Sequence, residues 1–395
     1  MPVTENTTDI VISGGGVPGL TLALLLGRLG LAIAVLEPHP PAPAREIKPD
    51  GRTAALMAKS INILTSAGVW EACAPYAAAL KTLRIVEGET RADFQSGEIG
   101  LPFFGMNMPN NLQRAILTEQ AAKLPSITLL ADSLSGFESD DFGVTVRLES
   151  GKSLRTRLLV GADGRRSKVR KDSGIAVRER DYGQSALTCL IDHTRPHDNI
   201  STEFHRPGGP FTIVPLPDTE SGHRSSIVWV EYNDDADRFL KLRRQDFEAA
   251  LQERSANLVG KITLATPPQS WPLKALRAKE LTAPRVALIA EAAHVVHPLG
   301  AQGLNLSLRD AATLAEEIAD AARRGQDIGS AVILDRYAYR RRADILTRVT
   351  GIDGLNRLVS NDISLLRSLR GAGLKTISAL EPLRRFTMKE GVMPG

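Results

Sequence analysis

The sequence predicts an α/β fold: a helix-covered parallel sheet with an inserted, mostly antiparallel sheet and a C-terminal helical region. The chain opens with a strand, a glycine-rich turn, a helix and a second strand over 9–36, and this βαβ order requires a parallel sheet. The segment 185–232 alternates apolar and polar residues between Pro and Gly, as antiparallel strands do. Helical periodicity resumes after Arg285.

Composition sets the scale. The 395 residues are 43% hydrophobic and 24% charged, which is ordinary globular usage and excludes a disordered or coiled-coil chain. We expect a discontinuous domain of residues 1–75, 100–180 and 276–395, with C-terminal helices from about residue 336. Residues 76–99 and 181–275 are expected to form a second domain around the inserted sheet.

The remaining elements follow from local patterns. Apolar spacing predicts helices over 52–67, 110–124 and 245–254, and the Pro-rich stretch 38–49 predicts a loop. Alternation predicts strands over 83–87 and 92–95, and a hairpin over 143–157 that turns at Ser150–Gly151. A separate strand is expected over 158–160.

Charge and cysteine content exclude several classes of protein. The net charge of +4 is too small to indicate nucleic-acid binding. The polar start is no signal peptide, and the apolar run 20–26 is too short to span a bilayer. Cys73 and Cys189 cannot build a disulfide framework or a zinc site. We therefore expect a cytoplasmic protein without a metal, in contact with the inner face of the cytoplasmic membrane at most through its surface.

The glycine-rich turn has a recognisable pattern. Gly14, Gly16 and Gly19 form G-x-G-x-x-G between a strand and a helix, and Glu37 ends the next strand. Such glycines allow a tight turn, close approach of a pyrophosphate and close helix packing, while the acid accepts hydrogen bonds from a ribose. The pattern predicts FAD or NAD rather than NADP, and a glycine turn without a ligand is the alternative.

Two later segments extend this pattern to the whole chain. LLVGADGRRSKVR over 158–170 and VALIAEAAHVVHPLGAQGLNLSLRDA over 286–311, together with the glycine turn, resemble the class A FAD-dependent aromatic hydroxylases. The resemblance implies a Rossmann-like FAD-binding domain of the p-hydroxybenzoate hydroxylase type, with the inserted sheet covering the substrate. GPFTIVPLPDTESGHRSSIVWVEY and the ending KEGVMPG are similar to ubiquinone-biosynthesis hydroxylases that act on 2-octaprenylphenol or 2-octaprenyl-6-methoxyphenol.

The resemblance assigns individual positions to tightly but non-covalently bound FAD. It places the flavin ring at Pro298, Gly300, Gln302 and Gly303, before a helix expected over 305–322. The family usually has Gly-Asp where this chain has Ala290 and Glu291, which puts the ribityl geometry in doubt. The cofactor residues that it implies are Gly14, Gly16, Gly19, Glu37, Arg52, Arg114, Asp163, Gly164, Glu291, Gly303, Leu304 and Asn305.

The implied reaction is hydroxylation of a prenylated phenol with O2 and NADH or NADPH, through a C4a-hydroperoxyflavin. No protein acid or base stands out, because the cofactor carries this chemistry and the protein orients and shields it. The sheet is expected to roof the site, with these candidate wall residues: Phe204, Phe211, Val214, Leu216, Val228 and Val230.

Other interpretations stay open. The chain is alternatively a hydroxylase of a soluble aromatic compound, a flavin dehydrogenase, or a non-catalytic scaffold of a quinone-synthesis protein complex. His294 and His297 are expected to be structural or cofactor-adjacent, and Ser167 to be a capping or solvated residue. Arg340–Arg342 and the basic amphipathic tail 361–395 predict either packing or solvation, or docking on an anionic membrane surface.

Overall fold

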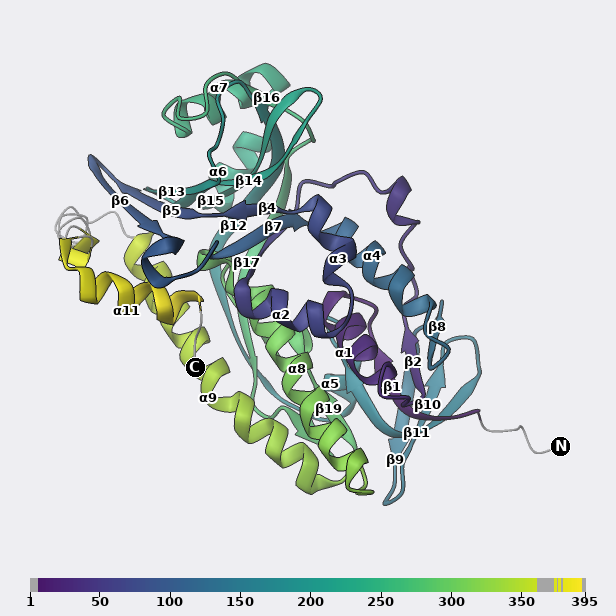
Figure 1. Ribbon diagram of the computed structural model, residues 1–395. Helices are drawn as coiled ribbons and strands as arrows, with labels where there is room; N and C mark the ends of the chain where they lie inside the picture. Colours follow the sequence, from purple (N-terminus) through teal and green to yellow (C-terminus); the bar gives the residue numbers. More distant parts are fainter. Residues whose placement is uncertain (1–5, 361–372, 375, 378, 393–395) are drawn as a thin grey trace.

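A computed structural model describes residues 6–360, 373–374, 376–377 and 379–392, folded around three sheets (Figure 1). The first sheet has eight strands, and β1 is central, parallel to β11 on one side and β2 on the other. Ile10, Val11 and Ile12 of β1 are fully buried. The order is β18 (Thr282–Ala283), β19 (Val286–Leu288), β11 (Ser153–Gly161), β1 (Asn6–Ser13), β2 (Ile33–Leu36) and β8 (Ile127–Leu130), with β10 (Val144–Leu148) beside β11 and β9 (Leu134–Ser139) beside β10.

Helices cover this sheet. The glycine turn leads directly into α1, which packs against α8 and α4, and α8 packs in turn against α9. Gly19 permits close contact between α1 and the turn that precedes it, because a Cβ there would lie 2.2 Å from the Gly14 carbonyl oxygen. The α-helices of this part are α1 (Val17–Gly27), α2 (Ala58–Ser66), α3 (Trp70–Cys73), α4 (Asn110–Ala122), α5 (Lys168–Asp172), α8 (Gln302–Arg323) and α9 (Ala331–Val359).

The second sheet has nine strands and is mostly antiparallel, as the sequence predicts. Its one parallel pair joins β13 to β5, which brings the segment 82–95 into the sheet. The order is β20 (His294–Val295), β17 (Gln269–Ala278), β12 (Val177–His193), β15 (Gly222–Tyr232), β14 (Gly209–Thr219), β13 (Ile200–Arg206), β5 (Thr82–Glu87) and β6 (Thr90–Gln95), with β16 (Ile262–Leu264) beside β12. The helices α6 (Asn233–Leu240) and α7 (Arg244–Arg254) cover one face and share a core with Trp229 and Phe247.

A third, three-stranded sheet contacts the second. It consists of β3 (Thr53–Met57), β7 (Gly105–Pro109) and β4 (Ala78–Leu80), and both β7 and β4 contact β14. Short 3-10 turns complete the fold: η1 (Ala44–Glu46), η2 (Ala74–Tyr76), η3 (Ser96–Ile99), η4 (Ala290–Ala292) and η5 (Leu299–Ala301).

Three predicted boundaries are wrong. The helix predicted over 52–67 is β3 followed by α2, because residues 53–57 pair with β7 in a continuous register. The second hairpin arm and the strand predicted over 158–160 are one strand, β11, which pairs with β10 at its start and with β19 at its end. The helix predicted over 305–322 begins three residues earlier, at Gln302.

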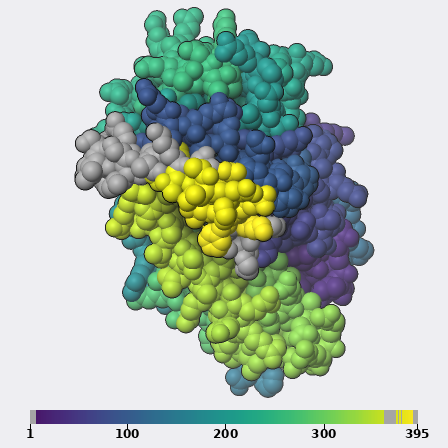
Figure 2. Space-filling model, turned by 60° about the vertical axis from the view of Figure 1, so that its left-hand side comes forward, coloured from purple at the N-terminus to yellow at the C-terminus, as the bar shows by residue number. Residues whose placement is uncertain are grey.

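The C-terminal helices lie on one face of the molecule. Figure 2 shows α11 (Glu381–Val392, yellow) lying beside α9 and the segment that holds β5 and β6. Met388 is buried in a cluster with Phe94 and Phe104, and Arg384 donates to Glu98 of η3 at 2.7 Å. Of the predicted amphipathic segment 361–395, residues 361–372, 375, 378 and 393–395 lie outside the described residues. Among the described helices, none has a stretch both long and apolar enough to span a bilayer.

Candidate active site

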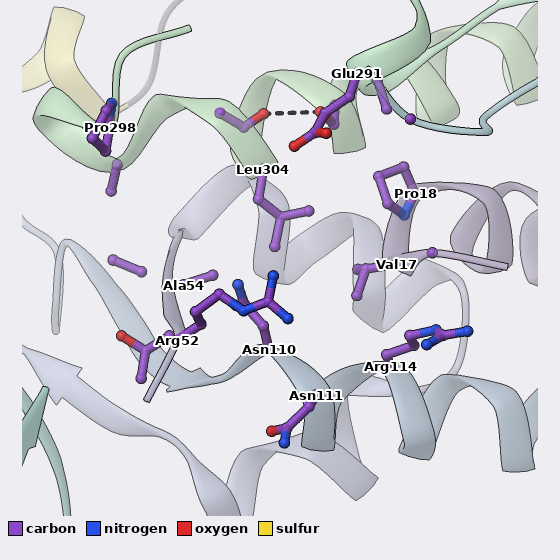
Figure 3. A pocket seen from close by; sticks show the side chains of 18 of the residues that line it. Val17, Pro18, Arg52, Ala54, Asn110, Asn111, Arg114, Glu291, Pro298 and Leu304 are labelled. Atoms are coloured by element: carbon purple, nitrogen blue, oxygen red, sulfur yellow. Dashed lines mark hydrogen bonds between the residues drawn. The ribbon is translucent and has the colours of Figure 1, made fainter. Parts of the chain in front are cut away.

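A cavity of about 820 Å³ extends from the glycine turn to the second sheet. This volume lies within the usual range for small-molecule sites. Figure 3 shows Glu291 and Pro298 on one side and Arg52, Asn110 and Arg114 on the other. The lining comes from the start of α1, the loop 39–47, β3, β7, α4, the turn after β11, η4, β20, the start of α8, β14 and β15.

The glycine turn forms one end of this cavity. Gly16 lies at the N-cap of α1, which no side chain caps, and a Cβ built on Gly16 would meet nothing closer than 3.8 Å. Gly14 instead packs against Ala162, and Gly19 against Gly14. The uncapped helix N-terminus therefore faces open space through Gly16, and this arrangement fits a bound pyrophosphate.

Arg114 and Glu37 stand beside the turn. Arg114 donates to the carbonyl oxygens of Gly15 at 3.0 Å and His39 at 2.7 Å, and its ion pair with Glu37 is 3.0 Å long. The Gly15 N–H donates to the same carboxylate at 3.1 Å. Glu37 lines a smaller adjoining cavity of about 100 Å³ rather than the main one. Both charges are thus held in place before any ligand arrives.

In the A-D-G segment, one residue lines the cavity and its neighbour holds the start of α5. Gly164 lines the cavity, whereas Asp163 does not. One Asp163 oxygen accepts the N–H groups of Lys168 and Val169 at the start of α5, and the other is buried without a hydrogen-bond partner. Ser167 caps the same helix by accepting from the N–H of Arg170 at 2.9 Å, which confirms the capping alternative.

The η4 turn carries the residues that depart from the family pattern. Ala290 has a φ of 57°, in the left-handed region, and both Ala290 and Glu291 line the cavity. In Figure 3 the Glu291 carboxylate extends toward Leu304. The carboxylate is therefore presented to the cavity although the preceding residue is not glycine.

A buried carboxylate fixes this turn. Asp310 of α8 is fully buried, accepts the Ala290 N–H at 2.9 Å, and lies 2.6 Å from His294 Nε2. Its other oxygen accepts from Arg341 of α9 at 2.7 Å, and Arg341 also binds Asp344. Burial raises the pKa of Asp310, but the charges of His294 and Arg341 outweigh it and lower the pKa overall. This Asp310 network joins the turn to two helices.

The start of α8 forms another part of the cavity wall. Pro298, Gly303 and Leu304 line the cavity, whereas Gly300 and Gln302 do not. The Asn305 side chain also points elsewhere: it donates to the Ala55 carbonyl and accepts the Met57 N–H, both at 2.8 Å. Asn305 therefore ties α8 to β3, and the helix N-terminus that it fixes faces the cavity.

The far end of the cavity reaches the second sheet. Of the six predicted wall residues, only Val214 and Val228 line it. Phe204 and Phe211 belong to the core under α6 and α7, while Leu216 and Val230 are also buried without lining the cavity. These four predictions are wrong. Phe211 faces the opposite side of its strand from Val214, and Phe204 packs with it in that core. Leu216 and Val230 share a strand face with Val214 and Val228 but lie one position beyond the part of that face that lines the cavity.

Two polar residues at this end were not predicted. Asn107 of β7 is 1% exposed and lines the cavity, and its Nδ2 donates to the Pro215 carbonyl at 2.9 Å. Thr53 also lines it, with its hydroxyl 2.8 Å from that of Ser226. No sequence motif marks Asn107, because its position depends on the pairing of β7 with β3 and β4.

Arg52 stands at the cavity wall between two partners. Its guanidinium makes a two-pronged ion pair with Asp50, at 3.0 and 3.2 Å, and lies 4.4 Å from the centre of the Trp271 ring. Trp271 belongs to the second sheet, so Arg52 links the loop before β3 to that sheet.

Several other side chains lie outside the cavity. His297 is fully buried against Tyr182, and burial lowers its pKa to about 4. Cys73 and Cys189 are buried, and burial raises the pKa of each thiol to about 12. Across the described residues, no three His, Cys, Asp or Glu side chains come together as a metal site requires.

The arginine run of α9 is not a solvated face throughout. Arg341 is buried in the Asp310 network, while Arg340 pairs with Glu316 and Glu317, and Arg342 with Glu280. The alternative of lipid docking through all three arginines is therefore wrong for Arg341.

Comparison with known proteins gives consistent relationships. Residues 7–350 match the family described as FAD binding domain. The chain is 34% identical to ubiquinone hydroxylase UbiL of Rhodospirillum rubrum, over 99% of this chain and 91% of that protein. It is 32% identical to 3-demethoxyubiquinol 3-hydroxylase of Escherichia coli, over 98% and 99%. Its fold is similar to that of p-nitrophenol 4-monooxygenase PnpA of Pseudomonas putida, with a TM-score of 0.80, 21% identity and 98% coverage of both chains.

Proposed function

Because the chain belongs to the FAD-binding family of aromatic monooxygenases and is an FAD-dependent hydroxylase of the ubiquinone-biosynthesis type, we propose that its substrate is a prenylated phenol. One observation supports this most directly: a single cavity connects the glycine turn with an apolar end at Val214 and Val228. The cofactor and an aromatic ring therefore have room side by side.

The cavity residues fit FAD in one orientation, with its adenosine half at the glycine turn and its flavin ring at the start of α8. Gly16 and the start of α1 would hold the pyrophosphate, with Arg114 beside it, and Glu37 would bind the adenosine ribose in the adjoining cavity. Glu291 would meet the ribityl chain, and the flavin ring would lie along Gly303 and Leu304 at the positive end of α8. Six further residues lie outside the cavity lining, and we propose that they act through backbone groups or by supporting the residues that line it: Gly14, Gly19, Asp163, Gly300, Gln302 and Asn305.

The overall reaction replaces one ring hydrogen by hydroxyl. The phenol, O2, NAD(P)H and one proton give the hydroxylated ring, NAD(P)+ and water, so one oxygen atom enters the product and the other leaves as water. Bound FAD supplies the electron transfer and oxygen activation. The protein orients the ring and surrounds it with apolar side chains such as Val214 and Val228. On this proposal, residues 76–99 and 181–275 cover the substrate and the rest of the chain holds the cofactor.

The experiment is a spectrum followed by oxygen uptake. Purified protein should show flavin absorption, and a short-chain prenylphenol should stimulate NAD(P)H-driven O2 uptake and gain one oxygen atom. Colourless protein that cannot be reloaded with FAD would support the scaffold alternative instead. Stimulation by soluble phenols alone would indicate a soluble-aromatic hydroxylase, and substrate turnover without O2 uptake a dehydrogenase.

We also propose that α11 contacts an anionic membrane surface, where a polyprenyl substrate resides. Leu380, Leu383 and Phe386 are 53%, 39% and 63% exposed and lie three residues apart, with the exposed side chains of Arg385 and Lys389 nearby. Apolar side chains flanked by basic ones suit an interfacial helix.

Vesicle co-sedimentation tests this membrane contact. Leu383→Ser with Phe386→Ser should reduce binding to vesicles containing phosphatidylglycerol, whereas Phe142→Ser, at a more exposed site (85%) on the β9–β10 turn, should not. Equal vesicle binding by both variants would overturn the membrane proposal. Binding of a partner protein at α11 would instead indicate that this helix contacts a quinone-synthesis protein complex.

A further inference from the structure

We propose that Asn107 binds the substrate directly, by accepting a hydrogen bond from its phenolic hydroxyl through Oδ1. This inference rests on the proposed function and deepens it, since it assigns the residue that distinguishes a free phenol from its ether. Asn107 Oδ1 is a buried oxygen without a hydrogen-bond partner, on a residue that lines the cavity.

The orientation of the Asn107 amide is fixed by its nitrogen, Nδ2. Asn107 Nδ2 donates to the Pro215 carbonyl at 2.9 Å and to Ser226 Oγ at 3.3 Å. Rotating the amide by a half turn would place Oδ1 against the Pro215 carbonyl, and two acceptors repel. The second sheet therefore takes the donor side of Asn107 and leaves the acceptor side unsatisfied.

An unsatisfied buried acceptor is uncommon and needs a reason. Buried polar groups in native proteins nearly always have a partner, and an unpartnered one calls for an explanation such as a catalytic role or a bound water or ion. Asn107 lies at the substrate end, since its partners Pro215 and Ser226 belong to the same strands as Val214 and Val228. A ring placed against these valines presents its hydroxyl to the nearest acceptor.

The neighbouring polar groups are less suitable. The Thr53 and Ser226 hydroxyls satisfy each other at 2.8 Å. Asn110 Oδ1 is also buried and unpartnered, but Asn110 begins α4 next to Arg52, to whose carbonyl its N–H donates. Figure 3 shows Asn110 beside the Arg52 side chain. Among the lining residues, Asn107 combines an unpartnered acceptor with direct hydrogen bonds to the substrate sheet.

A hydroxyl donor would complete this site, and an ether oxygen would not, because an ether has no hydrogen to donate. A site built to pair a substrate hydroxyl discriminates strongly against analogues that lack it. The inferred ligand class is thus a ring with at least one free hydroxyl, placed so that this hydroxyl meets β7 while the rest of the ring contacts Val214 and Val228.

The test compares two ligands across two variants of the FAD-loaded enzyme. A short-chain prenylphenol and its O-methyl ether are titrated, and dissociation constants are taken from the change in flavin absorption. Asn107→Leu should weaken phenol binding by about 10- to 100-fold and change ether binding much less, so that the preference for the phenol collapses. Asn107→Ala, which carries less bulk, should reproduce the collapse and guards against misfolding of the larger variant.

Thr202→Val provides the matched control. Thr202, on β13 of the second sheet, is 1% exposed and also has an unpartnered buried oxygen, but it does not line the cavity. Its substitution should leave the ratio of the two dissociation constants unchanged. An unchanged ratio in both Asn107 variants, with flavin bound, would overturn this inference and leave the proposed function standing. Failure of every protein, including the unmodified one, to bind FAD would instead overturn the proposed function.

Discussion

Ala290 is a single residue held in a backbone conformation that favours glycine. Its φ is 57°, and its N–H is fixed by Asp310 at 2.9 Å. A left-handed conformation costs a non-glycine residue about 1–2 kcal/mol, while glycine loses more entropy on folding. The Asp310 hydrogen bond offsets part of the cost, so the turn forms with alanine in place.

Ala290→Gly should therefore raise the free energy of unfolding by roughly 0.5–1 kcal/mol. Urea unfolding of the FAD-free protein measures this without a contribution from the ligand. Ala293→Gly is the control, because Ala293 is buried in a right-handed conformation and should lose about 1 kcal/mol. Equal losses in both variants would mean that the turn carries no strain at Ala290.

His297 makes stability depend on pH. Burial lowers its pKa from 6.5 to about 4, so between these values the unfolded chain binds a proton that the folded protein does not. The free energy of unfolding should then fall as the pH decreases from 6.5 to 4, by up to about 3 kcal/mol from this residue. In His297→Asn, which keeps an acceptor for the Leu299 N–H, the decrease should be smaller by this amount. His39→Gln, which replaces an exposed histidine, should retain the full decrease. If the free energy of unfolding of His297→Asn fell with pH as steeply as that of the unmodified protein, the assignment of this decrease to His297 would be refuted.

At the scale of elements, the Asp310 network joins α8, α9 and η4. Asp310→Asn should cost about 3–5 kcal/mol, since Arg341 keeps its charge in a buried position. It should also weaken FAD binding at least tenfold, because the turn that presents Glu291 loses its support. Asp327→Asn breaks the remote ion pair with Arg285 and should lower stability while leaving FAD affinity intact. Equal FAD affinities in the two variants would show that the network is structural only.

The same elements show what the sequence can predict. Helix α4 was predicted within two residues, because its apolar spacing is local. Residues 53–57 were predicted as helix but form β3, because pairing with β7 outweighs the helical preference of Ala and Leu. The glycine turn was predictable since Gly14 and Gly19 each meet a local steric demand and Gly16 opens the start of the following helix. The contact of Asp310 with Arg341 was not, because it depends on how two helices pack, and Asn107 depends on sheet pairing in the same way.

At the scale of the whole molecule, the cavity lies between the segments that follow β1, β11 and β19 of the first sheet and the strands of the second sheet, so a ligand that fills it ties the two parts together. FAD at 100 times its dissociation constant should stabilise the protein by about 2.7 kcal/mol, seen as a higher melting temperature. FMN, which lacks the adenosine half, should stabilise less at the same concentration because it leaves the Glu37 cavity empty. Equal stabilisation by FMN would place the cofactor away from the glycine turn.

The two buried thiols have a consequence for the working life of the enzyme. When oxygen is reduced without reaching the ring, a flavin hydroxylase releases hydrogen peroxide next to its own polypeptide. Peroxide attacks thiolates, and the chain has two cysteines, each buried with a thiol pKa of about 12. Neither presents a thiolate at neutral pH, so the protein should withstand its own by-product without sulfenic acid formation, and idle turnover in the absence of substrate need not inactivate it through its cysteines.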